Sequence, residues 1–133
     1  MHAVPSGERT LTDLDYSRLD RLLDRQFVPA LADLLALAEV ESSRAIDERV
    51  VTMYSQFELL DLDTNRRQTL TICYPGDAQP LAGFISVLSP VGLSVLGLKA
   101  GDVARRQAPN GEVCMSRVAA VLFQPEATGD YIT

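Results

Sequence analysis

The sequence contains no tryptophan, one histidine and two cysteines in 133 residues. The only histidine, His2, lies at the chain start, which excludes histidine acid–base catalysis, catalytic triads and His-rich metal sites; we expect no metal or other cofactor. Cys73 and Cys114 lack Cys-x-x-Cys spacing, so we expect two buried free thiols in a reducing compartment. No apolar run reaches the ~18 residues of a membrane span, and the N-terminus lacks a signal-peptide core. We therefore expect a cytoplasmic protein with no membrane contact.

Positive charge is also scarce, and the formal net charge is -6. Non-specific nucleic-acid binding needs a basic footprint, so we expect no direct nucleic-acid partner. Residues 1–49 carry six arginines against ten acidic residues, and residues 50–133 carry six basic against eight acidic residues. This acidic excess in the N-terminal part favours a basic partner surface.

Helical periodicity dominates residues 1–49 after a flexible lead-in at 1–9. Thr12 is a suitable N-cap for an amphipathic helix over 13–25, with Asp13 and Asp15 on a solvated first turn where the helix dipole favours acids. Pro29 suits the start of a second helix, predicted from Ala30 to about Ala45. The short connection predicts an antiparallel, coiled-coil-like hairpin.

The second helix carries more apolar surface than one short partner helix would cover. Packing in the core and between the helices is the simplest interpretation, but a dimer or partner face is an open alternative. The residues concerned are Leu31, Leu34, Leu35, Leu37 and Ala38.

The period changes to that of strands at Val50. A domain over 50–133 is therefore predicted after the helical part at 1–49. Its expected strands and turns are a long strand over 50–62, a turn at 63–66, a strand over 69–74, a loop at 75–80, a strand over 102–108, a turn at 109–111 and a closing strand over 113–123.

Between these strands lies the segment around which the rest is arranged, residues 84–102, which we call the Ser-Pro unit. An apolar strand over 84–88 runs into Ser89, a helix cap, and Pro90, which fits the first helical position. Val91 and the aliphatic residues after it give one apolar face. Gly97 and Gly101 bracket the exit, where glycine tolerates positive φ, and Asp102 begins the next strand.

The ordered string of Ser89, Pro90, an aliphatic residue, Gly97 and the Gly101-Asp102 pair resembles the C-terminal domain of the bacterial GreA/GreB transcript-cleavage factors. The hairpin from Val51, the loop near Tyr74 and the tail 124–131 extend the resemblance to the regulator of nucleoside diphosphate kinase family, a Gre-related group with a truncated hairpin. The resemblance implies an α+β fold, in which the helical hairpin precedes an FKBP-like antiparallel sheet with one short helix.

The resemblance also implies a function. Gre factors insert a long hairpin into the secondary channel of RNA polymerase, and an Asp-x-x-Glu-type pair at its tip helps hold magnesium. Here Phe27 stands three residues after Asp24, and the helices are short. The sequence therefore predicts a non-enzymatic regulator that binds polymerase near the channel rim and competes with Gre factors without stimulating cleavage. The alternative is a regulator of the level or activity of nucleoside diphosphate kinase, with an indirect link between the chain and that kinase.

The resemblance suggests two polymerase-binding surfaces. The first is the loop and helix start at Ser89, Pro90 and Val91; the residue before them, often acidic in Gre factors, is Leu88 here. The second is the hairpin around Asp20, Asp24 and Phe27. An FKBP-like fold also suggests prolyl isomerase activity as a candidate function. Those enzymes line their pocket with aromatic residues, and aromatic residues form only 6% of this chain, so the fold alone does not support this activity.

Overall fold

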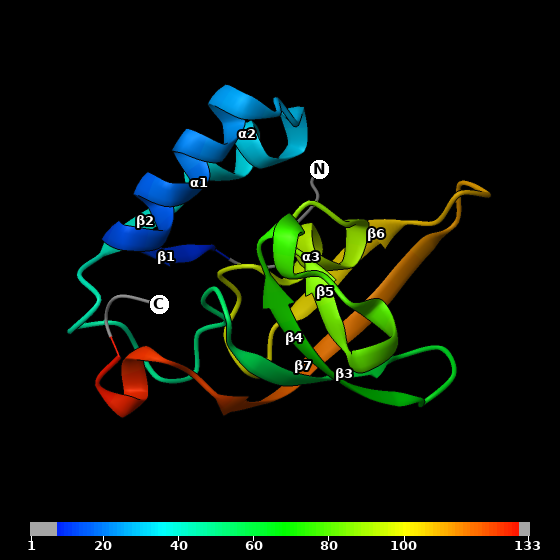
Figure 1. The fold of residues 1–133 in the computed structure, drawn as a ribbon. Helices are drawn as coiled ribbons and strands as arrows, with labels where there is room; N and C mark the ends of the chain where they lie inside the picture. The colour runs from blue at the N-terminus through cyan, green and yellow to red at the C-terminus, as the bar shows by residue number, and fades with distance from the viewer. Residues whose placement is uncertain (1–7, 131–133) are drawn as a thin grey trace.

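The computed structural model describes residues 8–130; the lead-in at 1–7, which includes His2, and the tail residue Tyr131 lie outside this range. Two helices and a small two-stranded sheet precede a larger curled sheet (Figure 1). The helices and strands are β1 (Thr10–Thr12), α1 (Asp13–Arg25), α2 (Pro29–Leu37), β2 (Glu39–Glu41), β3 (Gln56–Asp61), β4 (Arg67–Cys73), β5 (Phe84–Ser86), α3 (Pro90–Val95), β6 (Val103–Gln107) and β7 (Val113–Phe123). Short 3-10 helices lie between β4 and β5 at η1 (Pro75–Asp77) and η2 (Pro80–Ala82), and after β7 at η3 (Glu126–Thr128).

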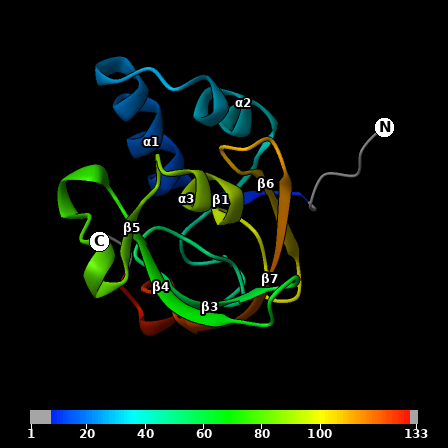
Figure 2. The same ribbon diagram turned by 90° about the vertical axis from the view of Figure 1, so that its right-hand side faces the viewer.

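The larger sheet has the strand order β5-β4-β3-β7-β6 and is antiparallel except for the β4–β5 pair. It curls around α3, while α1 and α2 lie beyond α3 on the same side (Figure 2). Apolar side chains from both parts meet in one core, which includes Leu19, Leu31 and Leu35 from the helices and Phe57, Ile72, Leu96 and Val118 from the sheet region. The predicted α+β class, with a mainly antiparallel sheet over one short helix, is confirmed. The division at residue 49 stays a prediction.

The first helix begins and ends where the sequence predicts. Thr12 is extended, and its hydroxyl oxygen accepts a hydrogen bond from the Asp15 amide at 3.0 Å. This bond satisfies one of the amides that a helix start leaves open. The helix contacts α2 across the short 26–28 connection, which is compatible with the expected hairpin.

The second helix is shorter than predicted, because it ends at Leu37 and not near Ala45. The chain then becomes extended and β2 pairs in parallel with β1, with Leu11 opposite Val40. The Glu39 amide also donates to the Arg9 carbonyl at 2.9 Å. Backbone pairing with a segment far back in the chain therefore replaces the helical bonds that local propensity favours.

The long strand predicted over 50–62 is also wrong, since only 56–61 form β3. Val50 makes an isolated bridge to Lys99, and Tyr54 has a φ of 65°. The Ser55 hydroxyl accepts from the Thr52 amide at 2.9 Å, which holds a turn in place of a strand. Ser and Thr hydroxyls stabilise such turns by bonding nearby backbone groups.

The Ser-Pro unit has the predicted order with shorter elements. The strand β5 ends at Ser86 and not at Leu88, and β6 begins at Val103, one residue after Asp102. Gly97 and Gly101 have φ values of 81° and 98°, as expected. The Asp102 carboxylate accepts from the Lys99 amide at 2.9 Å and closes the turn before β6.

Two smaller findings complete the fold. Both cysteines are free; Cys73 is buried as expected, and Cys114 is only partly buried. Within residues 8–130, no helix combines the length and the apolar composition that crossing a membrane would require.

The turn at Gly101 generates a test of stability. A β-branched side chain is strained at positive φ, so Gly101→Val should lower the free energy of unfolding by more than ~1 kcal/mol and the melting temperature by several degrees. Gly76→Val is the control, because Gly76 has an ordinary φ and a Cβ there meets no atom within 4 Å. Equal melting temperatures for the two variants, measured by circular dichroism, would contradict a strained turn at Gly101.

Candidate functional site

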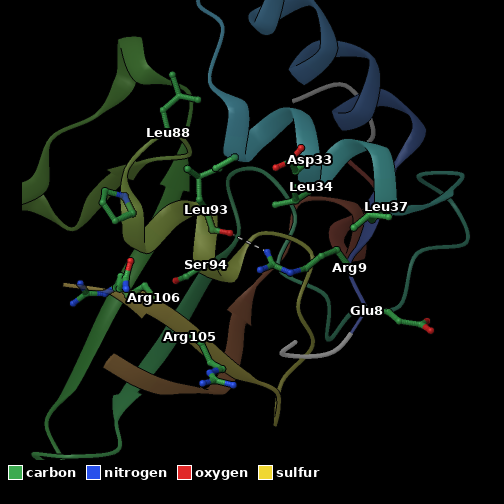
Figure 3. Close-up of a pocket in the computed structure, with 13 residues that line it drawn as sticks. Glu8, Arg9, Asp33, Leu34, Leu37, Leu88, Leu93, Ser94, Arg105 and Arg106 are labelled. Carbon is green, nitrogen blue, oxygen red and sulfur yellow. Dashed lines mark hydrogen bonds between the residues drawn. The ribbon is translucent and has the colours of Figure 1, made fainter. Parts of the chain in front are cut away.

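A groove separates α2 from the Ser-Pro unit and has a volume of about 810 Å³. We call it the Ser-Pro groove. Leu34 and Leu37 point into it from α2, and Leu88 and Leu93 lie on the opposite wall (Figure 3). Its remaining lining residues are Glu8, Arg9, Ala30, Asp33, Pro90, Ser94, Arg105, Arg106 and Gln107. Leu37 is 86% exposed at this groove, whereas Leu31 and Leu35 are buried in the core, so only part of the apolar surface predicted on the second helix faces solvent.

The first predicted binding residues form the start of α3. Ser89 accepts a hydrogen bond from the Gly92 amide at 3.1 Å and donates one to the Ser86 carbonyl at 2.7 Å. Pro90 occupies the first helical turn and is exposed at the groove. Gly92 allows α3 to lie close to the end of β5, because a Cβ there would lie 2.2 Å from the Ser86 carbonyl oxygen. Ser89 is thus fixed as a cap, while Pro90 is exposed to solvent at the groove.

Arg9 holds the N-terminal strand against the end of α3. Its guanidinium donates to the carbonyls of Leu93 at 2.9 Å and Leu96 at 2.8 Å, and the first of these bonds is drawn in Figure 3. These carbonyls lack partners within a helix as short as α3. Burial lowers the pKa of Arg9, and the charge of Asp102 acts in the opposite direction. The flexible lead-in predicted over 1–9 is therefore wrong at Arg9, which is anchored.

The second predicted surface lies apart from this groove. Asp20 and Asp24 are exposed on α1, and Phe27 is 69% exposed in the connection between the helices. None of these three residues lines the Ser-Pro groove. The structure thus brings the Ser-Pro unit together with α2 and not with the tip of the hairpin. Within residues 8–130, no group of three His, Cys, Asp or Glu side chains is arranged to hold a metal ion.

A pair of buried acids joins α1 to the 52–55 turn and to the tail, and we call it the carboxylate joint. Asp15 is 1% exposed, and its Oδ2 accepts a hydrogen bond from the Met53 amide at 3.1 Å. Glu126 is 8% exposed and accepts from the Thr52 hydroxyl at 2.7 Å. Asp15 was predicted on a solvated turn, and that interpretation is wrong. Only the neighbouring Asp13 is exposed.

The carboxylate joint perturbs both acids. Burial is the main reason why the pKa of Asp15 is raised to about 7; the charge of Glu126 acts in the same direction, while the Met53 bond and the Arg18 charge oppose it. Burial also raises the pKa of Glu126, while the Thr52 bond opposes this. Asp15 Oδ1 is buried without a hydrogen-bond partner among residues 8–130, so the charged carboxyl loses its hydration on that side with no hydrogen bond in its place.

Sequence reasoning missed the carboxylate joint and the Arg9 anchor. Thr12 followed by Asp15 has the spacing of a capping box, which is a local signal for an acid turned back toward the chain. Glu126 lies in the tail string, beside Gln124, whose amide donates to the Asp47 and Val50 carbonyls at 2.8 and 2.9 Å. No local pattern indicates that the tail, the 47–55 segment and α1 meet, because the contacts join residues 38 and 74 positions apart.

Comparisons with known proteins agree with this geometry. Residues 46–122 match the model for the family described as "Transcription elongation factor, GreA/GreB, C-term". The chain is 33% identical over 131 residues to the "Regulator of nucleoside diphosphate kinase" of Escherichia coli strain K12, covering 92% of this chain and 94% of that protein. It is 38% identical over 73 residues to the transcription elongation factor GreA of Solidesulfovibrio magneticus, across 55% of this chain and 44% of GreA.

A solved structure gives the same result. The chain superposes with a TM-score of 0.73 and 33% identity on the "Prokaryotic transcription elongation factor GreA/GreB from Nitrosomonas europaea", over 88% of this chain and 99% of that one. The resemblance read from the Ser-Pro unit and the tail is therefore confirmed.

The carboxylate joint makes stability depend on pH. The pKa of Asp15 rises from 3.8 to about 7 on folding, so the folded state binds more protons between these values. The free energy of unfolding should thus fall as pH rises from about 4 to about 7, by on the order of 2–4 kcal/mol. Asp15→Asn should remove this loss and be more stable than the parent at pH 8, with little difference at pH 4.

Urea unfolding at the two pH values measures the effect. Asp20→Asn on the exposed face of α1 is the matched control and should follow the parent. A loss of stability in Asp15→Asn that is the same at both pH values would mean that the buried charge carries no penalty.

Proposed function

Because the chain belongs to the GreA/GreB transcription elongation factor family, we propose that it is a non-enzymatic regulator that binds RNA polymerase at the rim of the secondary channel. There it competes with the longer Gre factors. The observation that carries the proposal is the Ser-Pro groove, where Pro90 at the start of α3 faces Leu34 and Leu37 of α2. An apolar groove of this kind accepts apolar side chains of a partner helix. In Gre factors the loop that matches Ser89 and Pro90 lies against a coiled coil of polymerase at the channel rim.

The charges around the groove favour one kind of partner helix. Arg9, Arg105 and Arg106 line it together with the acids Glu8 and Asp33, so its balance is positive on a chain of net charge -6. Arg9 is committed to α3, which leaves Arg105 and Arg106 for acidic side chains on the partner. Leu88 stands where Gre factors often have an acid, so a charge contact of that loop with a basic partner group is absent here.

The hairpin supports regulation without cleavage. The helix α1 has 13 residues and α2 has 9, so at 1.5 Å per residue they span about 20 Å and about 14 Å. Asp24 has no acidic partner three residues on, where Phe27 stands. Holding a catalytic magnesium needs several oxygen ligands at close spacing, which this connection does not supply.

A second candidate function follows from one finding, the 33% identity to a protein named regulator of nucleoside diphosphate kinase. In this alternative the chain controls the level or the activity of that kinase. A pull-down from cytoplasmic extract separates the two, because recovery of polymerase supports the first and recovery of the kinase without polymerase supports the second. Kinase activity that changes in cells but not in a purified mixture would make the link indirect.

The absence of cleavage stimulation can be tested in a backtracked elongation complex. The purified chain should leave RNA cleavage at the rate of polymerase alone, and it should slow cleavage by an added Gre factor. RNA length analysis on gels measures both rates. Magnesium-dependent cleavage above the polymerase background would contradict the proposed mode of action.

Substitutions across the Ser-Pro groove test the binding surface. Pro90→Glu and Leu37→Glu place a charge on opposite walls of the groove, so each should weaken polymerase binding at least about tenfold, or 1.4 kcal/mol. Both side chains are exposed, so the fold should be retained in circular dichroism spectra. Fluorescence competition against a labelled Gre factor measures the affinity.

Two controls separate contact from folding. Leu81→Glu changes an exposed leucine outside the groove and should bind as the parent does. Ser89→Ala removes the cap, costs about 1 kcal/mol of stability and should leave affinity intact, whereas Ser89→Arg adds a bulky charge beside Pro90 and should weaken binding. If folded Pro90→Glu and Leu37→Glu bind as tightly as the parent, the contact lies instead on the hairpin around Asp20, Asp24 and Phe27.

A further inference from the structure

The strand β6 lies at one edge of the larger sheet (Figure 2). Among residues 8–130 it pairs with β7 alone, so its other side is not covered by a strand. The side chains of Arg105 and Gln107 are exposed along this edge, which borders the Ser-Pro groove. The inference below rests on the backbone of β6, and it holds whether or not polymerase binds in that groove.

Every second residue of β6 turns its backbone groups away from β7. At one end of the strand pair, the Ala108 amide donates to the Glu112 carbonyl at 2.8 Å. At the other end, the Val118 amide donates to the Asp102 carbonyl at 2.9 Å. Backbone groups along an antiparallel pair alternate between facing the partner strand and facing away from it, so the even-numbered residues face β7. The residues whose N–H and C=O groups face outward, with no hydrogen-bond partner among residues 8–130, are Val103, Arg105 and Gln107.

Outward backbone groups of this kind bind an extended peptide as a further strand. A second copy of this chain is a poor occupant of the edge. Antiparallel pairing of two complete β6 strands is centred on Arg105 and would place two arginines directly opposite each other, which destabilises such a pair. An acidic residue opposite Arg105 would instead be attracted, because Arg105 forms no ion pair within 4 Å with residues 8–130.

We propose that the edge of β6 binds an extended segment of a partner protein in which acidic and apolar residues alternate. Side chains along a strand point to the two faces of the sheet in turn. On the outer face, an acidic side chain of the added strand would lie beside Arg105. On the inner face Ala104 is 3% exposed, and Leu88 and Leu93 of the adjoining groove offer apolar contacts.

Arg106 shares the inner face with Ala104 but does not make that face a second site for acids. Its charge already acts on the Asp61 carboxylate of β3. The formal net charge of -6 also repels an acidic peptide at long range, although salt screens this repulsion beyond about 8 Å at physiological ionic strength. We therefore expect the backbone bonds and the apolar contacts to supply the affinity, while Arg105 selects which alternating peptides bind.

Titration of the isotope-labelled full chain with a synthetic peptide tests the proposal. The probe is a capped peptide of alternating glutamate and valine residues at physiological ionic strength. It should bind with a dissociation constant below about 1 mM, and nuclear magnetic resonance should show the largest amide shifts in β6. A peptide of the same composition with its valines grouped together should bind at least about tenfold more weakly.

Loss of single N–H groups separates strand addition from attraction by charge. Every second residue of an added strand turns its N–H toward β6, so N-methylation of one alternate set of peptide amides should abolish binding and N-methylation of the other set should not. In the protein, Gln107→Pro removes an outward N–H but no bond to β7, a position where an edge strand tolerates proline. It should bind the peptide at least about tenfold more weakly than Gln107→Ala, which loses the same side chain but keeps the N–H. The amide spectrum checks that both variants are folded.

Charge reversal tests the selectivity. Arg105→Glu should weaken binding of the glutamate peptide and favour a peptide of alternating lysine and valine. Arg66→Glu makes the same change at an exposed residue just before β4 and should do neither. Three results would overturn the proposal: no saturable shift in β6 below about 1 mM peptide, equal effects of the two methylated peptides, or equal affinity of the two Gln107 variants. Shifts in β6 that grow with protein concentration alone would assign the edge to a second copy of the chain instead.

Discussion

The burial of Asp15 is the constraint on which the arrangement of this molecule depends. A carboxyl group that is 1% exposed must satisfy its oxygens inside the protein, and Met53 supplies a backbone amide at 3.1 Å for one of them. That bond places the first turn of α1 against the 52–55 turn. The same turn binds Glu126 through Thr52. Helix, turn and tail therefore come together around two acids.

The carboxylate joint is a costly way to hold a fold. Apolar side chains at these positions would avoid the penalty of burying charge, and replacing buried polar groups by apolar ones is often neutral or stabilising. What hydrogen bonds add is direction, because a bond to the Met53 amide holds only while the Asp15 carboxylate stays within hydrogen-bond distance and angle of that amide. In this molecule the direction matters, since α1 contacts α2, and α2 forms one wall of the Ser-Pro groove.

Local signals explain what the sequence could predict. The Thr12 cap, the Ser89-Pro90 start and the glycines at positive φ are decided within a few residues, and the structure has each of them at the expected place. The end of α2 was wrong because the 39–41 segment pairs with residues 10–12, about thirty positions earlier in the chain. Only one wall of the Ser-Pro groove could be predicted from the sequence. Pro90 is marked by its motif, whereas Leu37 and Arg105 come next to it only after folding. Burial of Asp15 follows from the tail, which no local pattern connects to the helix.

The parallel pairing of β1 with β2 has a consequence for how this family can diversify. The chain leaves the small sheet at Thr12, makes both helices and returns to the same sheet at Glu39. The two ends of the segment that forms α1 and α2, which we call the arm, are thereby held side by side by the small sheet. The 26–28 connection at the far end of the arm takes no part in that pairing. Arm length is thus a variable that evolution can change by inserting matched helical turns at the far end, with the base unaltered. A chain with short helices and a chain with long helices can therefore share the same β1–β2 pair, and a difference in helix length requires no change in the larger sheet.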